Sequence, residues 1–94
     1  MFEDYTIKYR LHAIQRMLER DIDEKIINTI VKNGKVISSY NNDKPYPSKL
    51  LLGFAKTKPI HVVAADNLKD KEVIIITVYE PDPLKWDSNF ERKL

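Results

Sequence analysis

The sequence has no cysteine and only two glycines among its 94 residues. The absence of cysteine excludes a disulfide scaffold, a cysteine-ligated zinc site and a thiol nucleophile, and it is typical of a reducing compartment. Because Gly34 and Gly53 are isolated, the chain has no glycine-rich loop that could hold a phosphate. No serine lies in a glycine-flanked nucleophile elbow, which disfavours serine hydrolase chemistry.

Long apolar runs are also missing. No run exceeds the length of Val73–Ile76, whereas a membrane-spanning helix needs about 20 apolar residues. The first ten residues, MFEDYTIKYR, contain no apolar segment of the kind found in targeting signals. We therefore expect a cytoplasmic protein that has no membrane partner.

The net charge is small, at +2, but it is unevenly distributed. Residues 1–34 are balanced, residues 35–60 carry +4, and residues 61–94 carry −2. The middle segment contains Lys35, Lys44, Lys49, Lys56 and Lys58, with Tyr40 among them. These side chains are candidate RNA-binding residues, because lysines contact phosphates and aromatic rings stack on bases. The alternative is that the lysines are solvated groups that protect hairpin edges from pairing.

The first third of the sequence predicts two short helices within about residues 8–33. Leu11, Ile14 and Leu18 recur at helical spacing and predict the buried stripe of the first helix. Asp23 is a typical N-cap for the second helix, and Gly34 suits a left-handed C-terminal cap. Because the link between the helices is short, we expect a helical hairpin.

The sequence period then changes to that of strands. Runs at residues 36–40, 50–55, 60–65 and 72–79 are β-branched or apolar, and short polar links separate them. Such links predict antiparallel neighbours, and Gly53 inside a strand suggests a bulge or a close backbone approach. The sheet should therefore occupy about residues 35–79 and the tail residues 80–94, with Trp86 docked on the body and the last residues frayed.

One face of this sheet should pack on the helices. In the last strand we expect Ile74, Ile76 and Val78 to face the helices, and Thr77 and Tyr79 to face the open side. The predicted fold class is α+β, as a single domain over residues 1–94. It consists of an N-terminal helical hairpin followed by a four-stranded antiparallel sheet.

His12, Arg16 and Arg20 are spaced four apart and so share one face of the first helix. A histidine in line with two arginines suits phosphate recognition, because arginine forks match phosphate oxygens and histidine transfers protons near neutral pH. The alternative is a solvent-facing polar surface in which Glu19 and Asp23 pair with the basic groups.

His61 lies in an apolar strand, where a histidine has either a structural or a catalytic role. The two histidines are far apart in sequence and show no metal-ligand spacing, so we expect no metal and no cofactor. Metal-free cleavage of an RNA phosphodiester needs a base, an acid and cations. His12, Arg16, Arg20, His61 and Tyr79 include all three kinds of group, so they are the candidate catalytic residues.

Four segments together resemble the domain of unknown function 4258 family over about Tyr9–Trp86: HAIQRMLERDID, NGKVISSYNNDKPYPSKLLLGF, PIHVVAAD and VIIITVYEPDPLKW. That family is similar to the RelE/BrnT-type toxins, so the resemblance implies a RelE/barnase-like fold of helices followed by an antiparallel sheet. It also implies a toxin-like endoribonuclease that needs no metal, acts on RNA and is neutralised by an antitoxin protein. The positions that match are His12, Arg16, Arg20, His61, Tyr79 and Glu80. The alternative is a non-catalytic module of the same fold that binds a protein or forms a homodimer.

Overall fold

The computed structural model describes residues 4–94 of the chain. Within them it contains five strands and two helices, in the order β1–α1–α2–β2–β3–β4–β5. The bounds are β1 Thr6–Tyr9, α1 Leu11–Arg20, α2 Glu24–Asn33, β2 Lys35–Tyr40, β3 Ser48–Ala55, β4 Lys58–Asn67 and β5 Glu72–Tyr79. The expectation about the start of the chain falls partly on residues 1–3, which lie outside the described residues.

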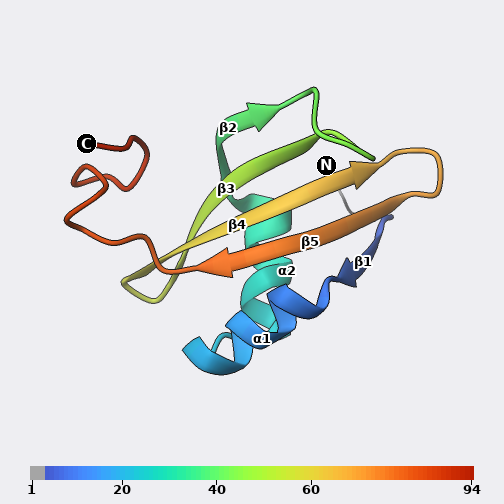
Figure 1. Cartoon of the computed structure of the whole chain (residues 1–94). Helices are drawn as coiled ribbons and strands as arrows, with labels where there is room; N and C mark the ends of the chain where they lie inside the picture. Colours follow the sequence, from blue (N-terminus) through green and yellow to red (C-terminus); the bar gives the residue numbers. More distant parts are fainter. Residues whose placement is uncertain (1–3) are drawn as a thin grey trace.

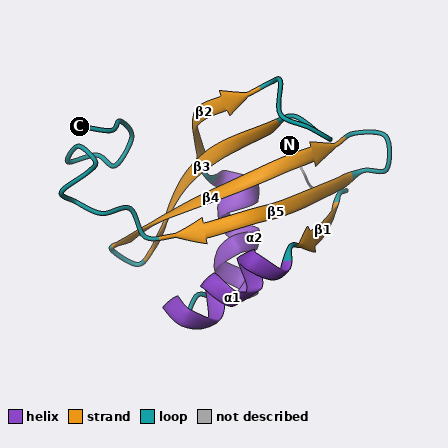
Figure 2. Ribbon diagram, viewed as in Figure 1, coloured by secondary structure: helices purple, strands orange, loops and turns teal. Residues whose placement is uncertain are grey.

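The strands form one mixed sheet in the order β1-β5-β4-β3-β2 (Figure 1). β2, β3, β4 and β5 pair antiparallel with their neighbours, whereas β1 runs parallel to β5. Both helices pack on one side of the sheet, and the opposite side faces the viewer in Figure 2. We call that opposite side the open face.

The predicted fold class was right about the four antiparallel strands but wrong about the N-terminus and the sheet. The chain begins with strand β1, not with a helical hairpin, and the sheet is five-stranded and mixed. Ile7 lies four residues before Leu11, a spacing that would also fit a helix. It pairs instead with Val73 of β5, because Thr6–Tyr9 alternates outward and inward side chains and fills the free edge of β5.

The core lies between the helices and the sheet. α1 contributes Ala13 and Met17, and α2 contributes Ile27, Ile30 and Val31. The expected stripe of α1 is wrong: Leu11, Ile14 and Leu18 are 71%, 41% and 79% exposed. The side chain of Ala13 is small enough to let α1 lie close to β5. The line from Ala13 to Met17, one turn apart, therefore makes the buried contact.

A β-bulge alters which residues of β5 face the helices. Val63 pairs with Thr77 and Ala64 with Ile75, so Ile76 is an extra residue on β5. As a result Val73, Ile75 and Val78 lie in the core, while Ile74 and Ile76 move to the open face. The expectation for Val78 is confirmed, and the expectation for Ile74 and Ile76 is wrong.

Two of the three local predictions about caps and glycines are confirmed. Asp23 caps α2, since its carboxylate accepts a hydrogen bond from the Ile26 N–H at 3.0 Å. A side chain at Gly53 would collide with Ile30, so this glycine permits a close approach between β3 and α2. Gly34 is not a left-handed cap, because its φ is −68°.

Candidate nucleic-acid interface

The basic stripe of His12, Arg16 and Arg20 runs along β5, at the border of the open face. At one end His12 lines a cavity together with Ala65 and Ile76. At the other end Arg20 lies 3.9 Å from Glu80, just past the end of β5. The eight residues from His12 to Arg20 span about 12 Å of helix, and the four residues from Ile76 to Glu80 span about 13 Å of strand. The two segments therefore have nearly the same length and can lie alongside each other.

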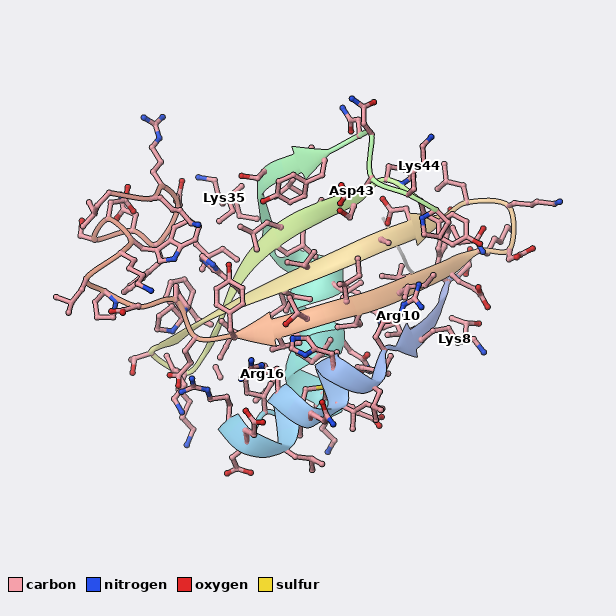
Figure 3. All side chains as sticks on the ribbon, viewed as in Figure 1. Lys8, Arg10, Arg16, Lys35, Asp43 and Lys44 are labelled. Carbon is pink, nitrogen blue, oxygen red and sulfur yellow. The ribbon has the colours of Figure 1, made fainter. Side chains whose placement is uncertain are left out.

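Arg16 therefore lies between these two ends, beside the second half of β5. Figure 3 shows it projecting from α1 next to this strand. Its guanidinium makes an exposed ion pair with Glu19 at 3.1 Å. This contact supports the solvent-facing alternative in part. However, a pair between exposed groups contributes only about 0–1 kcal/mol, so a phosphate can displace the carboxylate.

His61 is fully buried on the open side of β4, and protein groups surround its ring. Its Nδ1 lies 3.2 Å from the Tyr79 hydroxyl, and its Nε2 lies 2.8 Å from the Phe90 carbonyl oxygen. The Trp86 ring contacts it edge-on, with centroids 4.5 Å apart. Because a carbonyl can only accept, Nε2 carries the proton and Nδ1 is left as an acceptor for the Tyr79 hydroxyl.

The protonation states of this Tyr79–His61 pair follow from its burial. Burial lowers the pKa of His61, and the hydrogen bond to Phe90 opposes that shift only in part, so the ring is neutral at neutral pH. Burial and the nearby Tyr40 both raise the pKa of Tyr79, which therefore keeps its proton. The result is a phenol that donates to a neutral imidazole and is half-buried at the open face.

The tail after β5 covers His61. Trp86 is buried, which confirms its predicted docking. The end of the tail is not frayed, because the Leu94 N–H donates to the Lys85 carbonyl oxygen at 2.9 Å. Figure 1 shows the tail folded back beyond the end of β5. The sequence did not reveal this cover, since no local pattern links the tail to β4.

The five lysines of the middle segment do not form one surface. Lys44 lines the same cavity as His12 and so lies at the open face. Lys49 is two residues from the core residue Leu51, so it projects from the helix-covered side, where it lies 2.8 Å from Asp66. A run of charge along the sequence therefore overstated the size of the basic surface.

The other three lysines lie away from that cavity. Lys35 is 2.8 Å from Glu91 of the tail. Lys56 and Lys58 lie at the turn between β3 and β4, and Lys58 is 3.9 Å from Glu80. Tyr40 is exposed at the end of β2 and close enough to Tyr79 to affect its pKa. Of the candidate RNA-binding residues, Lys44 thus lies at the His12 end of the stripe and Tyr40 lies near Tyr79. Lys58 lies near the Arg20 end, because both side chains approach Glu80.

Sequence reasoning missed two residues at the same face, namely Arg10 and Asp43, which line the cavity together with Tyr46. Arg10 comes two residues before His12, outside the four-residue spacing that drew attention to the stripe. Among residues 4–94, no three metal-ligating side chains come together. Neither described helix is long and apolar enough to cross a membrane.

These features define a small α+β protein with an open sheet face bordered by a basic helix. The chain belongs to the family described as Domain of unknown function (DUF4258), which matches residues 9–80. No curated protein and no solved structure matches the chain. The match includes the basic stripe and the Tyr79–His61 pair, whereas the tail from Pro81 onward lies beyond it.

Proposed function

We propose that this protein is a toxin-like endoribonuclease that cleaves RNA without a metal ion. One observation carries the proposal: the Tyr79 hydroxyl, bonded to a neutral buried His61, opens onto a face bordered by His12 and Arg16. Such a face offers a base, a cation and an acid, the set that phosphodiester cleavage needs. The proposed relation to RelE/BrnT-type toxins agrees with this arrangement.

In the reaction, the 2′-oxygen of RNA attacks the adjacent phosphorus and the 5′-oxygen leaves. The 2′-hydroxyl proton passes to the Tyr79 oxygen as the Tyr79 proton passes to Nδ1 of His61. Phe90 stabilises the resulting imidazolium through its carbonyl oxygen, 2.8 Å from Nε2. Protonated His12 supplies the proton that the leaving 5′-oxygen takes up. The products are a 2′,3′-cyclic phosphate and a 5′-hydroxyl.

The arginines stabilise the charge that develops on the phosphate. Arg16 lies along the stripe between His12 and Arg20, and its planar fork matches two phosphate oxygens. Arg20 lies 3.9 Å from Glu80 at the far end of the stripe. There its positive charge adds to the attraction for the RNA phosphates. In this scheme His61 does not contact RNA, because it is fully buried and acts through Tyr79.

The test is cleavage of total RNA by the purified protein in the presence of a metal chelator. We expect the wild type to cleave and Tyr79→Phe to lose about 10²–10⁴-fold in rate, the usual contribution of a general base. Tyr9→Phe is the matched control. Tyr9 is also half-buried in the sheet, but it packs on the helix-side core. No cleavage by the wild type, or equal rates for Tyr79→Phe and wild type, would refute the proposal.

A second candidate function is protein binding without catalysis, either to an antitoxin-like partner or to another copy of the chain. The exposed apolar stripe of Leu11, Ile14 and Leu18 favours it, since such side chains are typical of interfaces. Light scattering on the wild type and on Leu18→Lys tests the homodimer. A wild-type dimer that becomes a monomer in the variant supports it, and a wild-type monomer counts against it.

A further inference from the structure

A cavity of about 430 Å³ opens at the end of the basic stripe, on the open face. Its floor is made by Ala65 and Ile76, and its walls come from the start of α1 and from the turn between β2 and β3. Sites for small organic groups have volumes of about 300–1,000 Å³ and combine apolar walls with a few fixed polar groups. The cavity has this character.

Two of its walls are held in place by buried neighbours. The hydroxyl of Ser48, a residue that is 3% exposed, donates to the Asp43 carboxylate. The side-chain amide of Asn67, also 3% exposed, donates to the Tyr46 hydroxyl at 3.1 Å. A carboxylate and an aromatic ring are therefore fixed on the same rim before any ligand binds.

The charges of the lining are mixed. Arg10, His12 and Lys44 supply donors, and among the described residues that line the cavity Asp43 is the one acidic side chain. The Arg10 backbone N–H donates to the Ile75 carbonyl oxygen at 3.0 Å, which anchors the arginine to β5. Figure 3 shows Arg10 next to β5, and Asp43 and Lys44 near the opposite rim. A ligand that uses this lining must present both hydrogen-bond donors and acceptors.

We infer that this cavity binds a guanine base of the RNA, beside the phosphodiester that is cut; this inference rests on the proposed function. Guanine presents two adjacent N–H donors on its Watson–Crick edge, which suit the Asp43 carboxylate. Its O6 and N7 atoms accept from an arginine or a lysine. Tyr46 lines the cavity, and its ring would stack on the base.

The cavity and the Tyr79–His61 pair are at a suitable separation for this role. Ile76 in the cavity floor and Tyr79 are three residues apart on one strand, which is about 10 Å. His12 contacts the cavity and is also the proposed proton donor. A base held in the cavity therefore positions a neighbouring phosphate against the stripe.

The test is a titration with 5′-GMP, 5′-AMP, 5′-CMP and 5′-UMP, followed by backbone amide NMR spectra. We expect GMP to bind about tenfold more tightly than the others and to shift the signals of Tyr46, Ala65 and Ile76. In Asp43→Asn and in Arg10→Gln, this preference should disappear. Asp21→Asn is the matched control, since Asp21 is an exposed carboxylate that lines a different cavity.

Equal binding of the four nucleotides, shifts that map elsewhere, or an unchanged preference in a folded Asp43→Asn would overturn the inference. Its failure is separate from that of the proposed function. RNA cleavage with no nucleotide preference would refute the guanine site alone. Selective GMP binding by a protein that does not cleave RNA would refute the nuclease alone.

Discussion

Replacing His61 with glutamine should make the stability of the fold less sensitive to acid. Burial lowers the pKa of His61 in the folded chain, whereas an unfolded chain has a histidine pKa of about 6.5. Below about pH 6.5 the unfolded state therefore binds a proton that the folded state does not. The free energy of unfolding contributed by this group is fully present above that pH and declines as the pH falls toward the folded pKa.

One such proton changes the free energy of unfolding by at most about 1.4 kcal/mol per pH unit. Glutamine does not titrate, and its amide can replace both contacts by accepting from Tyr79 and donating to Phe90. Urea unfolding at pH 7.5, 6.5 and 5.5 measures the difference. We expect the wild type to lose more stability on acidification than His61→Gln. Equal pH dependence in wild type and His61→Gln would refute the reasoning.

Two further predictions concern packing and charge. Gly53→Ala should lower the free energy of unfolding by about 1–3 kcal/mol, because the new methyl group collides with Ile30. Urea unfolding measures this, and an unchanged midpoint would contradict the close approach. Lys44→Gln should weaken single-stranded RNA binding and lower the salt slope by about 0.7, as expected for one lost phosphate contact. Lys49→Gln should leave RNA affinity unchanged, since Lys49 projects from the helix side. Fluorescence anisotropy against salt compares the two variants, and equal losses would contradict the assignment.

Short-range patterns predicted much of the fold. The four antiparallel strands follow from β-branched runs with short polar links, and the Asp23 cap follows from one side chain and its nearest backbone. The parallel pairing of β1 with β5 was missed because it joins residues more than sixty positions apart. No local pattern records such a pairing. The prediction assigned the wrong buried face to α1, because it relied on the large apolar residues Leu11, Ile14 and Leu18. The buried face instead contains Ala13, whose small side chain allows the close contact with the sheet.

In the candidate site, too, the short-range features were predictable from the sequence and the long-range contacts were not. Helical spacing alone put His12, Arg16 and Arg20 on one face. The pairing of His61 with Tyr79 depends on the register of β4 and β5, which a bulge shifts by one residue beyond Val63. The tail contact through Phe90 is longer in range still, at 29 residues. The lysines show the converse. Lys44 and Lys49 are close in sequence, but Lys44 lies at the open face and Lys49 lies on the helix side of the sheet.

The most direct test of the proposed reaction uses two matched oligonucleotides that differ at one position. One is RNA throughout, and the other lacks the 2′-hydroxyl next to the cleaved phosphate. In the presence of chelator, we predict that the wild-type protein cuts the first to a 2′,3′-cyclic phosphate and a 5′-hydroxyl, and leaves the second intact at that site. Equal cleavage of both oligonucleotides at that site, or no cleavage of the RNA, would contradict the proposed reaction.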